Sequence, residues 1–335
     1  MTSKKSIDRI RESAGSITIG DTRDGIITGA ITIADRLYIV KEKAIYRIAL
    51  ADEIDPERTR ADIPNTQQLV INAGSDSEIV RRILLTAEQL FKKDRLLSGV
   101  DFDAARLASL DILKDVIAAN EVSQLYKSAK IAAESGISSP KNMSFKLPGM
   151  PDIEARATTF IQKCDHAFQA IHKLCCIFYT EAEMRKAGKW LDGLVTLLRS
   201  RLETDDPFIE FAAALASVGK QVRNIRHCIE HPQKNQRIIV QDYRLTPTRE
   251  LAEPTIQVIH DTSASGPEPF GAFMEGVVSQ LLDGAELLMA YLASRNIESP
   301  GNIPVFVAEI PENQRRNGVR YGYLIDFGGS VSRLG

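Results

Sequence analysis

The chain has 335 residues, which is enough for one large domain or for two to three smaller ones. Hydrophobic residues make up 44% of the chain and charged residues 26%, a composition typical of an ordinary soluble globular protein. The formal net charge of −2 excludes a general attraction to nucleic acid or to an anionic membrane, so a polyanionic partner would need a local basic patch.

The N-terminal stretch MTSKKSIDRIRESAG is charged and lacks an apolar segment, so we do not expect a signal peptide. No apolar run approaches the roughly 20 residues that a membrane helix needs. The cysteines include no C-x-x-C pair, and three of the four lie at apolar positions of predicted helices. The sequence therefore predicts a cytoplasmic protein without membrane contact, disulfide, metal or cofactor.

The first block, residues 1–75, is predicted to be an N-terminal β-rich module. Residues 25–50 (GIITGAITIADRLYIVKEKAIYRIAL) are rich in β-branched and aromatic residues and are interrupted twice by charged turns. This pattern predicts a three-stranded antiparallel meander. The charged, proline-containing stretch after it is expected to be a loop, and LVINAGS one more short strand.

Residues 76–134 are predicted to be a helical connector. Ser75 and Glu78 have the spacing of a capping box, and apolar residues at helical intervals follow them. Residues 103–134 continue the helical pattern, which we interpret as two helices. The segment SGISSPKNMSFKLPGMP, residues 135–151, is rich in Gly, Pro and Ser and is the best linker candidate in the chain.

Four strongly amphipathic segments follow within residues 153–296. Each carries one apolar stripe, so a shared core in a helical bundle is the economical arrangement. The four segments are residues 153–179, 183–203, 207–230 and 269–296.

Two further β-hairpins are expected. RIIVQDYRL and TIQVIH alternate at period two, which predicts a hairpin inserted at residues 236–262, between the third and fourth bundle helices. IPVFVAEI and VRYGYLIDF predict another hairpin within residues 300–335, which we expect to pack with the N-terminal strands in one sheet. The predicted fold class is α+β, mainly helical.

Several well-known chemical motifs are missing. No P-loop, dinucleotide-binding glycine pattern or nucleophile-elbow motif occurs. DFGG at residues 326–329 lacks the glycine-rich and catalytic loops of a kinase. His166 and His172 are six residues apart, which does not give the shared helical face of a metal site, so we expect both to be surface or interhelix polar residues.

The densest cluster of titratable side chains is VRNIRHCIEHP, residues 222–232. Arg226 and Glu230 are four residues apart and suit an ordinary helical ion pair, and positive side chains are favourable near a helix C-terminus. Pro232 then ends the helix, because the residue before a proline avoids the α region. This interpretation explains the segment without any function.

A second interpretation gives the cluster a chemical role. Because the helix ends before Pro232, we expect the ring of His231 to turn toward the face that carries Arg226. An imidazole that titrates near neutral pH is suited to take the proton of a ribose 2′-OH, and a guanidinium is suited to hold the phosphate. The pair therefore suits metal-independent RNA cleavage through attack of the 2′-OH on the neighbouring phosphate.

The segment RHCIEH, Arg226 to His231, resembles the motif of the HEPN superfamily: an Arg, a polar residue, three more residues and a His at the end of the third helix of a four-helix bundle. His227 is the polar second residue. The resemblance covers roughly residues 153–296 and leaves the strands at either end unexplained. It implies a homodimer whose two motifs face one cleft, and frequent RNase activity in toxin–antitoxin or phage-defence systems. It also implies an antitoxin or regulatory protein as a partner, and some members bind RNA or a partner without cutting.

Other residues near RHCIEH have an assisting role in this hypothesis. Asn224 either orients a phosphate or His227, or is simply solvated, and Glu230 either raises the pKa of His231 or only pairs with Arg226. Tyr243 is the only nearby aromatic candidate for base stacking. The basic residues around the segment suit RNA phosphates or mere surface solubility; those assigned to phosphate binding are Arg223, Lys234 and Arg237, and the others are Lys220 and Arg244.

The sequence thus leaves three hypotheses, and whether the chain is an enzyme stays open between them. In the first, it is a homodimeric endoribonuclease with His231 as base, Arg226 on the phosphate, and His227 and Asn224 assisting. In the second, the same bundle is a non-catalytic scaffold that binds RNA or protein. In the third, the bundle only mediates assembly and the β module binds a ligand.

Overall fold

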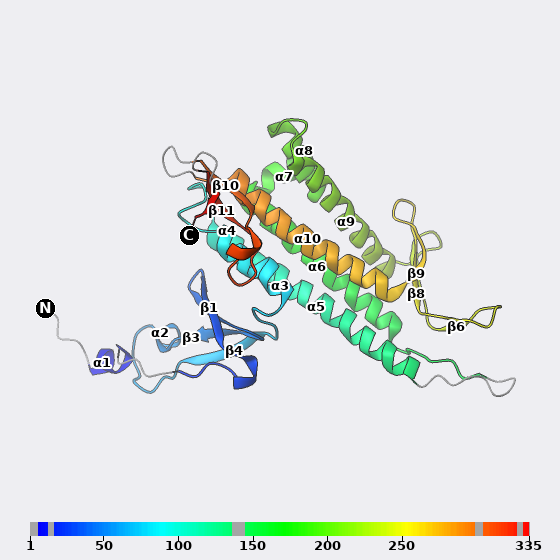
Figure 1. Cartoon of the computed structure of the whole chain (residues 1–335), viewed down its shortest axis with the longest axis horizontal. Helices are drawn as coiled ribbons and strands as arrows, with labels where there is room; N and C mark the ends of the chain where they lie inside the picture. The colour runs from blue at the N-terminus through cyan, green and yellow to red at the C-terminus, as the bar shows by residue number, and fades with distance from the viewer. Residues whose placement is uncertain (1–5, 13–16, 136–144, 299–303, 327–330, 335) are drawn as a thin grey trace. The chain divides into compact units, whose positions relative to one another are not determined.

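A computed structural model of the chain describes residues 6–12, 17–135, 145–298, 304–326 and 331–334 (Figure 1). The fold is mixed, with long helices and several small antiparallel sheets. The chain divides into two compact units, of which unit 1 comprises Met1–Leu96, Asp101–Leu107 and Ser299–Gly335 and unit 2 comprises Leu97–Val100 and Ala108–Glu298. In the described part of the chain, no helix combines the length and the apolar character that a bilayer span requires.

The N-terminal sheet of unit 1 has four antiparallel strands in chain order, β1 (Ile27–Ile33), β2 (Arg36–Lys41), β3 (Ile45–Ala49) and β4 (Thr66–Ile71). This confirms the predicted meander and the additional strand. The charged stretch between β3 and β4, expected to be a loop, also contains one helical turn, α2 (Ala51–Ile54). Alternate residues at the end of β1 are buried, since Ile31 and Ile33 are covered and Thr32 between them is exposed.

The C-terminal strands β10 (Val305–Glu309), β11 (Tyr321–Asp326) and β12 (Val331–Arg333) form a sheet of their own in the order β10-β11-β12. The predicted hairpin is confirmed as β10 and β11. The expectation of a single sheet with the N-terminal strands is wrong for the described residues. The physical reason lies in β11, where the buried Tyr323 donates its hydroxyl proton to the carbonyl of Leu90, at 2.6 Å, and so docks these strands on a helix.

That helix is α4 (Thr86–Leu90), which follows α3 (Glu78–Val80) and a π-helical segment, Arg81–Leu85. The predicted capping box does not form, because Ser77 is the N-cap residue and its side chain makes no capping hydrogen bond. Next comes α5 (Phe102–Ser135), a single helix where two were expected, since no Gly or Pro interrupts its sequence.

Beyond its first turns, α5 belongs to unit 2 and packs beside the predicted bundle. The Ser109 hydroxyl contacts the sulfur of Met289, and Lys163 pairs with Asp115. The other helices of the unit are α6 (Ile153–Phe178), α7 (Glu181–Ala187), α8 (Leu191–Arg201), α9 (Pro207–Glu230) and α10 (Phe270–Arg295) (Figure 1).

Three of the four predicted bundle helices have the expected bounds within one residue, and the second does not. Residues 183–203 form two helices, α7 and α8, because the chain turns at Gly188–Trp190 and Trp190 adopts a positive φ of 55°. The apolar stripes of these helices form the core of unit 2, which includes Phe160, Phe168, Leu194, Phe208, Leu281 and Leu288.

Between α9 and α10 lies a sheet with the order β5 (Arg237–Gln241), β8 (Thr255–Ile259) and β9 (Ser265–Pro269). The pairing of β5 with β8 confirms the predicted hairpin, and β9 adds a third strand. The tip between β5 and β8 holds a separate short pair of strands, β6 (Arg244–Leu245) and β7 (Leu251–Ala252). Since β5 starts a few residues after α9 ends, the sheet stands next to the end of α9 that carries RHCIEH. Residues 136–144 of the predicted linker lie outside the described residues.

Candidate functional site

Helix α9 positions most of the residues that the sequence singles out. Asp206 caps its start by accepting a hydrogen bond from the backbone N–H of Phe208, with Pro207 in the first turn. The buried stripe of the last turns is Val222, Ile225 and Cys228, so the residues between them face outward. His231 is the C-cap residue, and its backbone N–H donates to the carbonyl of His227 at 2.9 Å.

Arg226 is held by two carboxylates. Its Nη1 donates to Asp165 of α6, and its Nε donates to Oε1 of Glu230 at 2.8 Å. Only 1% of the Asp165 side chain is exposed, and Gln169 Nε2 also donates to its Oδ2 at 2.5 Å. The hydrogen bonds that Arg226 donates, first to Glu230 and then to Asp165, raise its pKa above the ordinary value. The guanidinium therefore ties α9 to α6, and its charge is compensated by neighbours in the same chain.

His227 and His231 lie together at the end of α9. Their ring centroids are 5.0 Å apart with the rings edge to face, and both residues are exposed. The Gln236 side chain bridges them, since its Nε2 donates to Nδ1 of His227 at 2.7 Å and to the backbone carbonyl of His231 at 3.2 Å.

Within one chain, the structure groups the predicted residues differently from the expectation. The ring of His231 lies against His227, while Arg226 donates to Asp165 and Glu230, and no hydrogen bond among the described residues joins Arg226 to His231. Glu230 pairs with Arg226. Asn224 donates its Nδ2 to the Ser263 hydroxyl at 2.8 Å, so it does not orient His227.

The predicted phosphate-binding residues lie on both sides of RHCIEH. Arg223 is exposed on α9 one turn earlier. Lys234 is exposed in the turn after the helix, and Arg237 at the start of β5 donates to its carbonyl. The assignment of Tyr243 to base stacking is wrong, because only 7% of it is exposed and its hydroxyl donates to Oε1 of Glu134 at 2.9 Å.

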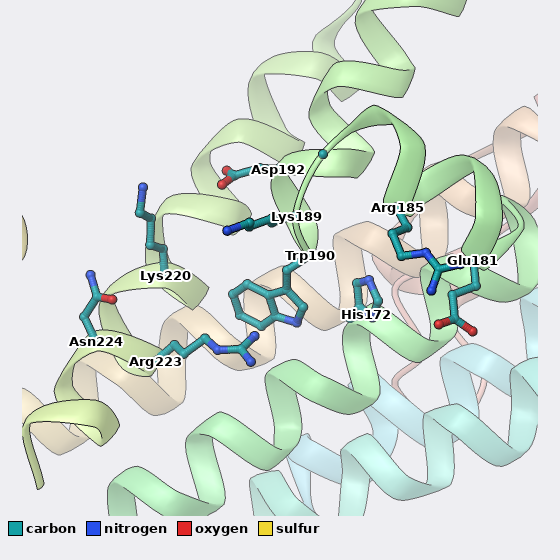
Figure 2. A pocket seen from close by; sticks show the side chains of 10 residues that line it. His172, Glu181, Arg185, Lys189, Trp190, Asp192, Lys220, Arg223 and Asn224 are labelled. Atoms are coloured by element: carbon teal, nitrogen blue, oxygen red, sulfur yellow. The ribbon is translucent and has the colours of Figure 1, made fainter. Parts of the chain in front are cut away.

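The aromatic residue that does stand beside α9 is Trp190, which the sequence analysis did not single out. It lies at the corner between α7 and α8 and lines a pocket of about 630 Å³, which we call the Trp190 pocket (Figure 2). The signal available in the sequence was that Trp190 is the only tryptophan of the chain. The pocket is lined by His172, Glu181, Arg185, Gly188, Lys189, Trp190, Asp192, Lys220, Arg223 and Asn224.

His172 of the HAFQAIH stretch is a wall of this pocket, whereas His166 is exposed on α6. Burial lowers the pKa of His172, and the charge of Arg223 acts in the same direction, against the opposite effect of Glu181. Nε2 of His172 lies 3.8 Å from Sγ of Cys176. At neutral pH the pocket therefore presents a neutral imidazole.

The prediction that three of the cysteines are buried on apolar helix faces is confirmed for Cys164, Cys175 and Cys228. Among the described residues, no three His, Cys, Asp or Glu side chains form a group that suits a metal ion. Comparison with protein-family models, with curated proteins and with solved structures found no match to this chain.

Proposed function

We propose that the chain is a HEPN-like, metal-independent endoribonuclease whose active site is RHCIEH at the end of α9. The observation that carries the proposal is the pair of exposed imidazoles, His227 and His231, with ring centroids 5.0 Å apart. They stand at the end of the same helix that holds Arg226 in a fixed orientation. Two imidazoles and a guanidinium are a sufficient set for cleavage by internal attack.

In the proposed reaction, His231 takes the proton of a ribose 2′-OH and the 2′-oxygen attacks the adjacent phosphorus. The P–O5′ bond breaks and a solvent water protonates the leaving 5′-oxygen, while His231 later returns its proton to solvent, so that the products are a 2′,3′-cyclic phosphate end and a 5′-OH end. Arg226 has one nitrogen, Nη2, that makes no hydrogen bond among the described residues. We assign this nitrogen to a phosphate oxygen, where it stabilises the charge of the transition state.

The proposal includes a homodimer in which two RHCIEH segments share one cleft. Within one chain, the His231 ring lies on His227 and Arg226 donates to Asp165. In the proposed dimer, the His231 of one copy would instead face the Arg226 of the other copy across the cleft. A toxin or phage-defence role, with a neutralising protein partner, belongs to the same proposal and rests on the HEPN resemblance of RHCIEH.

The test is RNA cleavage by the full chain in the presence of EDTA. We expect wild type to release 2′,3′-cyclic phosphate ends from single-stranded RNA, and His231→Ala to cleave about 100-fold more slowly or worse, which is the usual contribution of a general base. His166→Ala is the matched control, because His166 is exposed on α6 and lies outside the site. Equal rates for wild type and His231→Ala, or no cleavage by wild type, would refute the proposal.

One observation favours a second candidate, a HEPN-like protein that binds RNA or a protein partner without cutting. The charge of Arg226 is shared between Asp165 and Glu230, which reduces what it can offer to a phosphate. The two candidates separate in the same assay. RNA that is retained by the wild-type protein but gains no cyclic phosphate ends would identify the binding protein.

A further inference from the structure

The Trp190 pocket carries four cationic side chains that make no ion pair with the described residues. Arg185, Lys189, Lys220 and Arg223 line it, and no hydrogen bond or ion pair of these four occurs within the described part of the chain. This contrasts with Arg226 on the same helix, which is paired twice. The pocket also has two carboxylates, Glu181 and Asp192. Because positive groups outnumber negative ones, the pocket favours an anionic ligand.

The pocket also has a stacking surface. The guanidinium carbon of Arg223 lies 5.0 Å from the centroid of the Trp190 ring, and the indole is only partly buried. Figure 2 shows Lys189, Arg223 and His172 around the indole. Aromatic rings and guanidinium planes both stack on nucleobases, whatever the sequence. A pocket of about 630 Å³ lies within the ~300–1,000 Å³ typical of small-molecule sites.

Packing against α6 and α9 holds Trp190 in a strained backbone conformation. The residue has φ 55° and ψ −132°, a strained conformation that bulky side chains avoid. Its ring packs edge to face on Phe168, with centroids 6.2 Å apart. It also fits against Gly219 of α9, where an added Cβ would come within 2.8 Å of the indole Cη2. Strain of this kind is concentrated at functional sites, which adds to the case for a ligand here.

We propose that the Trp190 pocket binds a nucleoside phosphate, with the base stacked on the Trp190–Arg223 pair and the phosphate held by the lysines Lys189 and Lys220. The ligand is either one nucleotide of an RNA strand or a free nucleotide, since both present the same chemistry. Arg223 precedes Arg226 by one turn of α9, about 5 Å along the helix axis. If the pocket also guides an RNA strand toward RHCIEH, that role rests on the proposed ribonuclease function. Binding of a nucleoside phosphate in the pocket does not depend on it.

Trp190 supplies the signal for the experiment, because the chain has no other tryptophan. Its fluorescence is followed while AMP, adenosine, inorganic phosphate or a short single-stranded RNA is added to the full chain. We expect saturable quenching by AMP or by RNA, and much weaker effects of adenosine and phosphate alone. The affinity should fall as salt is raised, because phosphate contacts release counterions.

Two variants test the assigned residues. Lys220→Gln should weaken binding by about tenfold, the usual effect of losing one charge-assisted hydrogen bond. Arg223→Gln should weaken it by a similar factor, because it removes the guanidinium on which the base stacks. Lys186→Gln is the matched control, because Lys186 is an exposed lysine of α7 that does not line the pocket. Circular dichroism melts check that each variant is folded.

The outcomes separate this proposal from the ribonuclease. Saturation by AMP identifies a free-nucleotide site, and saturation by RNA alone identifies a strand-binding site; either result supports the pocket. His231→Ala should bind the nucleotide as tightly as wild type does. If wild type binds the nucleotide but never cleaves RNA, the binding proposal stands and the ribonuclease proposal is refuted. No saturable change with any ligand, quenching by phosphate alone as strong as by AMP, or unchanged affinity in both Lys220→Gln and Arg223→Gln would overturn the pocket.

Discussion

Arg223 and Arg226 stand one turn apart on α9 and have opposite surroundings. Arg226 belongs to the recognisable segment RHCIEH, yet Asp165 and Glu230 already compensate its charge. Arg223 lies outside that segment, yet it has no ion-pair partner among the described residues and rests on Trp190. A charge that belongs to a sequence motif is therefore not necessarily a charge that is available to a ligand. In this chain, Arg226 is held by its two carboxylates, whereas Arg223 is free to bind a ligand.

The largest expected effect concerns Arg226 and the stability of the fold. Arg226→Met leaves the carboxylate of Asp165 buried without its cation, so we expect the free energy of unfolding to fall by about 3 kcal/mol. Urea denaturation measures the loss. Arg156→Met is the control, because Arg156 pairs with the exposed Asp152 at 2.7 Å and such a surface pair contributes at most about 1 kcal/mol.

The double variant Arg226→Met with Asp165→Asn sharpens the same prediction. It removes the buried charge together with its partner, so its stability should recover part of what the single variant lost. Additive losses in the double variant would show that the ion pair does not account for the effect.

A middle-sized effect is expected where α9 meets Trp190. Gly219→Ala adds a Cβ within 2.8 Å of the indole and 2.9 Å of Phe168, so we expect a stability loss of about 1–3 kcal/mol from overpacking. The same change should move the indole and weaken nucleotide binding, as read from tryptophan fluorescence. Gly276→Ala is the control, because a Cβ there meets no atom within 4 Å. Similar stability and spectra for both variants would contradict the packing that we describe.

Arg223→Gln should change stability by at most about 1 kcal/mol, because the exposed side chain makes no ion pair among the described residues and loses only a cation–π contact with Trp190. Binding of a nucleoside phosphate should nevertheless fall about tenfold. Comparing urea midpoints with fluorescence titrations separates the two effects. A stability loss as large as that of Arg226→Met would remove the contrast between the two arginines.

The smallest effect is a pH dependence that originates at His172. Burial lowers its pKa in the folded protein below the ordinary 6.5, so the unfolded chain binds the proton more readily. The contribution is absent well above pH 6.5, and stability falls as the pH drops through that value. His172→Asn should make the free energy of unfolding less sensitive to pH between about 7 and 5. Identical pH profiles for wild type and His172→Asn would contradict this assignment.

The regular parts of unit 2 follow directly from the sequence. Apolar spacing places α6, α9 and α10 within one residue, and the position of Cys164, Cys175 and Cys228 on apolar faces predicts their burial. The corner at Trp190 escaped prediction, because residues 183–203 keep a helical period and nothing in a tryptophan indicates a positive φ.

The site was harder to predict for a different reason. Asp165 and Arg226 are 61 residues apart in the chain, and Glu134 and Tyr243 are 109 residues apart. The packing of helices and strands brings such residues together, and the spacing of residues in a short stretch of sequence does not reveal that packing. The sequence therefore located the charged end of α9, while its partners and the Trp190 pocket needed the structure.

The most direct test of the central claim is the chemistry of RNA ends after a single turnover in EDTA. Mass spectrometry of oligonucleotides treated with wild type should show 2′,3′-cyclic phosphate and 5′-OH ends, and His231→Ala should show about 100-fold fewer of them at the same time. Ends that accumulate equally with both proteins, or that carry no cyclic phosphate, would contradict the assignment of RHCIEH as a ribonuclease site.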